Sequence, residues 1–189
     1  MTNVDPGISA ANSRSIATLV LAGVAVILIV ILLWASIAYV PVGSVGVLTS
    51  FGGVTGEILP AGKHFVSPFK INHKLSIQTQ TLEGHTSTPS KEGLTLEMDI
   101  SLTYRLNPEK AASVYQALGT NYALTIIDPN LRSIIRDTTS EYSASTLYSS
   151  PRKPVEDKIT EDLRKVLGPR GIIIENVLLR DIQPAHTRG

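Results

Sequence analysis

The chain has 189 residues, 43% of them hydrophobic, which is enough for one domain with a full core and an additional segment. Its 17 Lys+Arg residues nearly balance 16 Asp+Glu residues, so there is no basic excess and we do not expect nucleic acid as a partner. Cysteine is absent, which excludes disulfides, thiolate metal sites and a cysteine nucleophile.

The first predicted element is a membrane-spanning helix over residues 15–40, after a tail of residues 1–14. Residues 15–39, "SIATLVLAGVAVILIVILLWASIAY", are apolar on every helical face, and no charged residue lies between Arg14 and Glu57. A helix of this length measures roughly 37 Å, against about 30 Å for the hydrocarbon core of a bilayer. The alternative is a cleaved signal peptide, but the apolar run is longer than a typical signal sequence.

The two ends of this segment indicate how it sits in a membrane. Trp34 and Tyr39 lie at its C-terminal end, where amphipathic rings favour the headgroup region, and Pro41 discourages further helix. Arg14 precedes the span, whereas the first basic residue after it is Lys63. The positive-inside rule therefore predicts a cytoplasmic or matrix N-terminus.

The domain that follows, predicted over residues 41–183, begins with β-structure. Residues 94–106, "LTLEMDISLTYRL", alternate apolar and polar side chains, which predicts a strand with one buried face. Residues 74–84 alternate more weakly, and the turn-rich "STPSKEG" joins the two segments as a hairpin or adjacent antiparallel pair.

Helices are predicted next along the chain. Residues 107–119 form the first, with Asn107 as the N-cap and Gly119 at its C-terminal end. Pro129 kinks or splits the segment 121–148, with Asp128 as a potential cap. A further helix lies within residues 151–171, and its predicted apolar stripe consists of Val155, Ile159, Leu163, Val166 and Leu167.

Residues 171–182 return to β-type composition, and a C-terminal stub of residues 184–189 follows. The order of these segments predicts an α+β fold with an antiparallel or mixed β-sheet and packed helices.

The glycine-rich segment 45–65, "VGVLTSFGGVTGEILPAGKHF", lacks the pattern of a nucleotide site. Gly62-Lys63 is followed by His64 rather than serine or threonine, so this is not a phosphate-binding loop, and its glycines are interpreted as turn residues. The histidines lack metal-ligand spacing, and no Gly-x-Ser-x-Gly elbow occurs. We predict no catalytic, cofactor-binding or metal-binding residue, although a dispersed triad stays open.

Aromatic residues near the membrane exit point to peripheral lipid contact. The three phenylalanines, Phe51, Phe65 and Phe69, all fall soon after the apolar segment, with lysines among them. Rings can insert between lipids while lysines stay near anionic headgroups. The alternative is that these rings are core residues. The predicted membrane-contact residues are Trp34, Tyr39, Phe65, Phe69, Lys63 and Lys70.

Five segments in this order resemble the stomatin/prohibitin/flotillin (SPFH, Band 7) family, most closely prohibitins and their bacterial relatives. They are "VGSVGVLTSFGGV", "LPAGKHFVSPF", "YRLNPEKA", "IRDTTSEYSASTLY" and "GIIIENVLLRDIQ". The resemblance implies a non-enzymatic, single-pass scaffold of a bacterial or mitochondrial inner membrane. It also implies homo- or hetero-oligomeric rings that organise membrane microdomains and bind membrane AAA proteases.

The family continues into a long coiled-coil helix, whereas this sequence stops at "PAHTRG", so the chain is either truncated or a natural short form. The mixed-charge segment 154–167 is the predicted contact between copies, through Glu156 or Asp162 and Arg164 or Lys165. A membrane-tethered binding module that regulates a protease or channel without forming rings is the alternative function, and an anchored hydrolase is the third.

Overall fold

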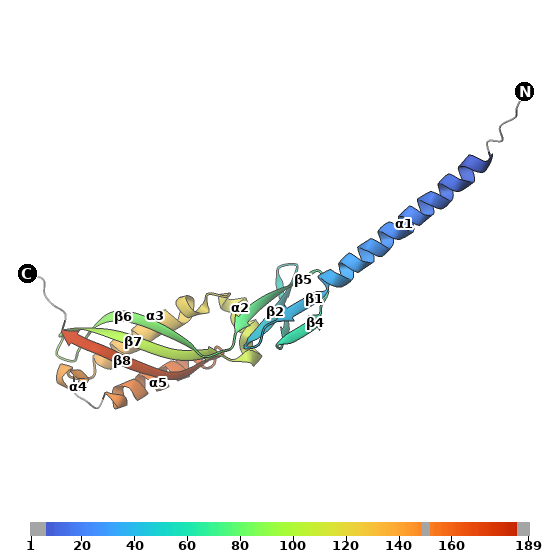
Figure 1. The fold of residues 1–189 in the computed structure, drawn as a ribbon. Coiled ribbons are helices and arrows are strands. Elements are labelled where there is room, and N and C mark those ends of the chain that lie inside the picture. Colours follow the sequence, from blue (N-terminus) through green and yellow to red (C-terminus); the bar gives the residue numbers. More distant parts are fainter. Residues whose placement is uncertain (1–6, 149–151, 185–189) are drawn as a thin grey trace, which may run out of the picture.

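The structure, a computed structural model, describes residues 7–148 and 152–184 (Figure 1). Helix α1 projects from one end of an elongated molecule, a small β layer adjoins it, and a three-stranded sheet backed by helices forms the other end. The strands are β1 Ile37–Val40, β2 Ser44–Ser50, β3 Gly53–Leu59, β4 Gly62–Phe65, β5 Lys70–Ser76, β6 Gln80–Pro89, β7 Thr95–Leu106 and β8 Ile172–Pro184. The helices are α1 Gly7–Ala35, α2 Ala111–Leu118, α3 Asp128–Thr139, α4 Ala144–Tyr148 and α5 Lys153–Leu167.

Helix α1 contains the predicted apolar segment, but its bounds differ from the predicted 15–40. Within the described residues, Thr18–Ala35 is the one stretch of helix long and apolar enough to cross a membrane. The helix begins earlier, at Gly7, and ends at Ala35, while residues 37–40 form β1. The prediction was wrong there because both faces of β1 carry apolar residues, so its alternation of exposed and buried positions is invisible in the sequence.

The β layer consists of two sheets, β1–β4 and β3–β2–β5, and all their pairings are antiparallel. The glycine-rich segment supplies β2, β3 and β4, and Gly52 adopts a φ of 85° in the β2–β3 turn. Gly52 is therefore a turn residue as predicted, but that interpretation was wrong for Gly46, Gly53, Gly56 and Gly62, which lie within strands. Val40 and Leu48 are fully buried between the two sheets.

The second layer is an antiparallel sheet in the order β6–β7–β8. The predicted antiparallel pair is confirmed, with β6 and β7 paired from Gln80↔Tyr104 to Pro89↔Thr95, but residues 74–76 of the predicted first strand belong to β5. The even-numbered residues of β7 face the helices and are buried, as the alternation predicted. The main core of the protein forms here, between the sheet and helices α3 and α5.

Asn107 and Gly119 act as predicted at the ends of the first helix, whereas Asp128 does not act as a cap. Asn107 caps a short 3₁₀ turn before α2, since its side chain accepts a hydrogen bond from the Glu109 N–H at 3.0 Å, and Gly119 ends α2 with a φ of 71°. Pro129 lies in the first turn of α3, directly after a π-helical turn, Ala123–Ile127. Asp128 does not cap α3: its carboxylate instead accepts two bonds from the Arg132 guanidinium.

Helix α5 lies along β8 and buries most of its predicted stripe. Its fully buried residues include Val155, Ile159, Leu163 and Leu167, whereas Val166 is 39% exposed and falls outside the stripe. Of the predicted C-terminal stub, Pro184 ends β8 and residues 185–189 lie outside the described residues. The α+β class with antiparallel sheets and packed helices is confirmed.

Candidate membrane contact and assembly site

Three segments of the chain meet at the end of the β layer next to α1: the α1–β1 junction, the end of β4 and the β2–β3 turn. Only Ser36 separates α1 from β1, and the Val66 N–H donates to the Ser36 carbonyl at 2.8 Å. Ile37, the first residue of β1, pairs with Phe65, the last residue of β4. The β2–β3 turn reaches the same end, since the Phe51 ring stacks on the Phe69 ring at a centroid distance of 6.4 Å.

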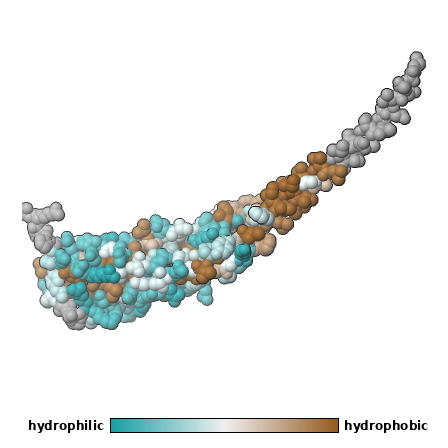
Figure 2. All heavy atoms as spheres, viewed as in Figure 1, coloured by the Kyte–Doolittle hydropathy of each residue, from teal (hydrophilic) through white to brown (hydrophobic). Residues whose placement is uncertain are grey.

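Large apolar side chains at this end are exposed. We call the set the aromatic end, and its members are Trp34 (80% exposed), Ile37 (48%), Phe51 (93%), Phe65 (78%) and Phe69 (68%). Exposed apolar patches of this kind on a folded domain mark contact with a membrane or another protein. The hydrophobic colour of α1 continues onto the adjoining part of the β layer, and hydrophilic residues dominate beyond it (Figure 2).

The predicted lysines and Tyr39 lie beside the aromatic end. Tyr39 and Lys63 are paired across β1 and β4 and share the exposed face with Phe65. The ammonium of Lys74 lies 5.9 Å from the Tyr39 ring centre. Lys70 forms an ion pair with Glu57 at 2.7 Å, so part of its charge is already compensated. Assignment of these residues to lipid contact stays a prediction.

Sequence reasoning grouped Phe51 with the other phenylalanines but did not select it, and it did not select Ile37 at all. The signal for Phe51 was available, because it directly precedes Gly52-Gly53, and a ring at a hairpin turn is rarely buried. The signal for Ile37 was not, since its exposure depends on the pairing of β1 with β4.

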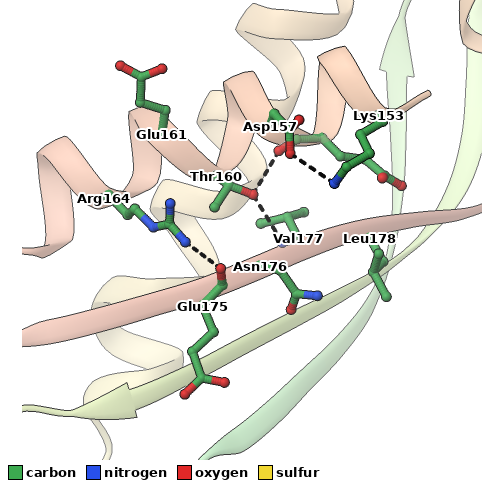
Figure 3. Close-up of a pocket in the computed structure, with 10 residues that line it drawn as sticks. Lys153, Asp157, Thr160, Glu161, Arg164, Glu175, Asn176, Val177 and Leu178 are labelled. Atoms are coloured by element: carbon green, nitrogen blue, oxygen red, sulfur yellow. Dashed lines mark hydrogen bonds and ion pairs between the residues drawn. The ribbon is translucent and has the colours of Figure 1, made fainter. Parts of the chain in front are cut away.

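On the opposite part of the molecule, side chains of α5 cover the outer edge of β8 (Figure 3). The Thr160 hydroxyl accepts from the Val177 N–H at 3.1 Å, and the Glu156 carboxylate accepts from the Leu179 N–H at 2.9 Å. The Arg164 guanidinium donates to the carbonyls of Ile174 and Glu175. These bonds satisfy strand groups that β7 does not reach and leave a polar groove of about 500 Å³.

The four residues predicted to join copies therefore fall into two pairs. The side chains of Glu156 and Arg164 form hydrogen bonds to the backbone of β8, as described above. Asp162 and Lys165 face outward, where the Lys165 ammonium lies 2.9 Å from Glu161 and 3.3 Å from Asp162. These carboxylates raise the pKa of Lys165, which keeps it charged. Contact between copies through these residues stays a prediction.

The structure was also searched for metal-binding clusters. Within residues 7–148 and 152–184, no group of three or more His, Cys, Asp or Glu side chains could hold a metal ion. His73 stacks on Tyr115 at 4.6 Å, and His85 pairs with Asp99 at 2.8 Å on the open face of the sheet. These two histidines lie in separate parts of the fold, and each already contacts another side chain.

Comparison with known proteins agrees with this architecture. The profile of the SPFH domain / Band 7 family matches residues 38–187. Prohibitin-1 of Colletotrichum higginsianum (strain IMI 349063) is 23% identical over 126 residues, which cover 66% of this chain and 46% of that protein. Mitochondrial prohibitin complex protein 1 of Caenorhabditis elegans is 19% identical over 130 residues, or 68% of this chain and 47% of that protein. This chain thus spans about half the length of the curated relatives it matches, and it belongs to the SPFH domain / Band 7 family.

Proposed function

We propose that this protein is a membrane-anchored scaffold whose α1 crosses the bilayer and whose domain rests on the membrane surface. The observation that carries the proposal is the aromatic end: exposed rings surround the point where the uncharged C-terminal part of α1, beyond Arg14, passes directly into a sheet. Membership of the SPFH domain / Band 7 family supports the same role.

The physical basis is burial of apolar surface that the domain itself does not cover. Transfer of one large apolar side chain out of water contributes about 1.5–3 kcal/mol. Phe65 and Phe69 lie one and three residues from Val66, which is bonded to Ser36 at the helix end, so both rings lie close to the level where α1 leaves the bilayer. Lys63 stays on the same face for contact with anionic headgroups.

The proposed orientation rests on the distribution of basic residues in the sequence. Arg14 before the span and Lys63 after it favour a cytoplasmic or matrix N-terminus, with the domain on the other side. A bacterial or mitochondrial inner membrane is the proposed site, and the name of the C. elegans relative includes the word mitochondrial. Protease added to intact spheroplasts should then digest the chain beyond residue 41, and full protection would reverse this orientation.

The scaffold acts without chemistry of its own by assembling with copies of itself or with related Band 7 proteins. Rings require an interface repeated by rotation, and Asp162 and Lys165 on the outer face of α5 are suited to set its register. Exposed ion pairs contribute only about 0–1 kcal/mol each, so further contacts must supply affinity. A membrane AAA protease held within such an assembly is the proposed partner.

Two experiments separate this proposal from its alternatives. Extraction with native lipids followed by imaging and native mass measurement should give closed assemblies of many copies. A monomer or a one-to-one complex would favour a tethered module that regulates one protease or channel. Labelling by activity-based hydrolase probes would support an anchored hydrolase and contradict the scaffold.

A further inference from the structure

Helix α2 leaves one face uncovered beside the turn that precedes β8. A groove of about 490 Å³ lies there, between α2, the π-helical turn and residues 169–170. Its floor is apolar: Val114 and Ile126 lie buried at its base, and Ala117 and Leu118 supply the accessible apolar surface. This volume falls within the range of about 300–1,000 Å³ that is typical of binding pockets.

The charges on the rim of this groove have one sign. Lys110 and Arg170 are the charged residues that line it, and no acidic side chain does. The Lys110 ammonium donates to the Pro169 carbonyl at 3.0 Å, which holds it at the rim. Arg170 is exposed and has no ion pair within the described residues. The groove beside α5, by contrast, mixes Glu156, Asp157 and Glu161 with basic residues.

Two backbone features build the groove. Gly171 has a φ of 89°, and a Cβ there would lie 2.7 Å from the Lys110 Cβ, so only glycine lets the turn approach α2 this closely. The π-helical turn Ala123–Ile127 brings Ile126 to the floor. π-Helical turns are rare and occur frequently at functional sites, which adds weight to this location.

We propose that this groove docks an acidic amphipathic helix of a partner protein. The apolar stripe of that helix would lie on Ala117 and Leu118, above the buried Val114 and Ile126, and carboxylates flanking the stripe would pair with Lys110 and Arg170. Charge complementarity selects this occupant, because an apolar floor between two unopposed cations suits apolar and acidic residues together.

A second copy of this chain does not fit the groove as well. Among the described helices, α3 and α5 bury their apolar stripes against the sheet. Helix α1 is apolar but carries no acidic residue. Helix α5 exposes Val166 beside Asp162, but this is one apolar residue at 39% exposure rather than a stripe. The described helices therefore favour a partner protein as the occupant.

The test uses the full chain in detergent micelles and a fluorescent helical peptide of about 18 residues, with leucines on one face and glutamates flanking them. Fluorescence anisotropy should show saturable binding that weakens with added salt, because the pairs are exposed. A second peptide with lysines in place of the glutamates should bind at least roughly tenfold more weakly.

Charge reversal provides the decisive variants. Lys110→Glu with Arg170→Glu should weaken binding of the acidic peptide at least roughly tenfold and strengthen binding of the basic one. The matched control is Lys91→Glu with Arg136→Glu, two exposed cations outside the groove, which should leave both affinities unchanged. Ala117→Trp, which fills the groove without a change of charge, should also abolish binding, with circular dichroism confirming the fold.

Several outcomes would overturn the proposal. These are failure of the acidic peptide to bind, equal binding of the two peptides, and unchanged binding after charge reversal. Displacement of the peptide by micelles containing phosphatidylglycerol, but not by neutral micelles, would assign the groove to an anionic lipid instead. None of these measurements depends on bilayer contact by the aromatic end or on ring formation, so the scaffold proposal and this one can fail separately.

Discussion

The two layers of the domain differ in how far they bury their large apolar side chains. The sheet β6–β7–β8 buries one face under helices, and side chains of α5 seal the edge of β8. The β layer next to α1 leaves the rings of Phe51, Phe65 and Phe69 exposed. Stability of the folded domain thus resides mainly in the helix-backed layer, whereas the β layer retains apolar surface for something outside the chain.

The largest effect on stability is expected in the helix-backed layer. Leu102 is fully buried in β7, so Leu102→Ala should lower the free energy of unfolding by about 2–5 kcal/mol. Urea denaturation of the full chain in detergent, followed by circular dichroism, measures this loss. Phe65→Ala in the exposed set should change stability by less than about 0.5 kcal/mol. Equal losses would remove the distinction between the layers.

The next effect concerns membrane association of a chain that begins at residue 36. This start keeps β1, whose Val40 is fully buried, whereas removal of residues 1–40 would expose the core of the β layer. Phe65→Ala with Phe69→Ala should weaken binding to anionic liposomes by up to about 1.5–3 kcal/mol per ring. Val42→Ala, an exposed residue in the turn at the opposite end of β1, is the control. Unchanged liposome binding in the double variant would rule out these rings as membrane contacts.

A smaller loss is expected where α5 seals β8. Thr160→Val removes the acceptor of the Val177 N–H and should cost about 1–3 kcal/mol. Hydrogen exchange of the Val177 amide should accelerate, because that group loses its partner. Thr81→Val, on an exposed position of β6, is the matched control. Exchange at Val177 as slow as in the unaltered protein would show that Thr160 does not protect this edge.

The smallest effect is a local dependence on pH in the β6–β7 turn. Hydrogen bonds from the Ala144 N–H and the Ser90 hydroxyl lower the pKa of Glu92 below its usual range. A carboxyl group with a depressed folded pKa stabilises the fold above its unfolded pKa, and this contribution is lost as pH falls through the folded value. The protection factors of the α4 amides, which correct for the pH dependence of intrinsic exchange, should therefore fall in acid, and Glu92→Gln should make these protection factors nearly independent of pH in that range.

The sequence was sufficient to predict elements in which apolar residues recur at one regular spacing, every second residue in a strand or every three to four residues in a helix. β7 alternates strictly, and four of the five predicted stripe residues of α5 are buried. β1 was missed because its neighbours in sequence are equally apolar. The contacts of Glu156 and Arg164 could not be predicted either, since a charged residue on a helix looks the same whether it faces solvent or the edge of a strand. Only the tertiary placement of α5 beside β8 decides between these two cases.

Because only Ser36 separates α1 from β1, a change in the tilt of the proposed anchor would rotate the whole domain like a lever. β7 alone, with twelve residues, extends for about 40 Å beyond the β layer. A change of about 10° in the tilt of α1, of the size that bilayers of different thickness impose, would move the far end of such a lever by roughly 7 Å. In the proposed assembly, neighbouring copies would then approach or separate at the end where β8 finishes, so the thickness of the lipid patch would alter their spacing.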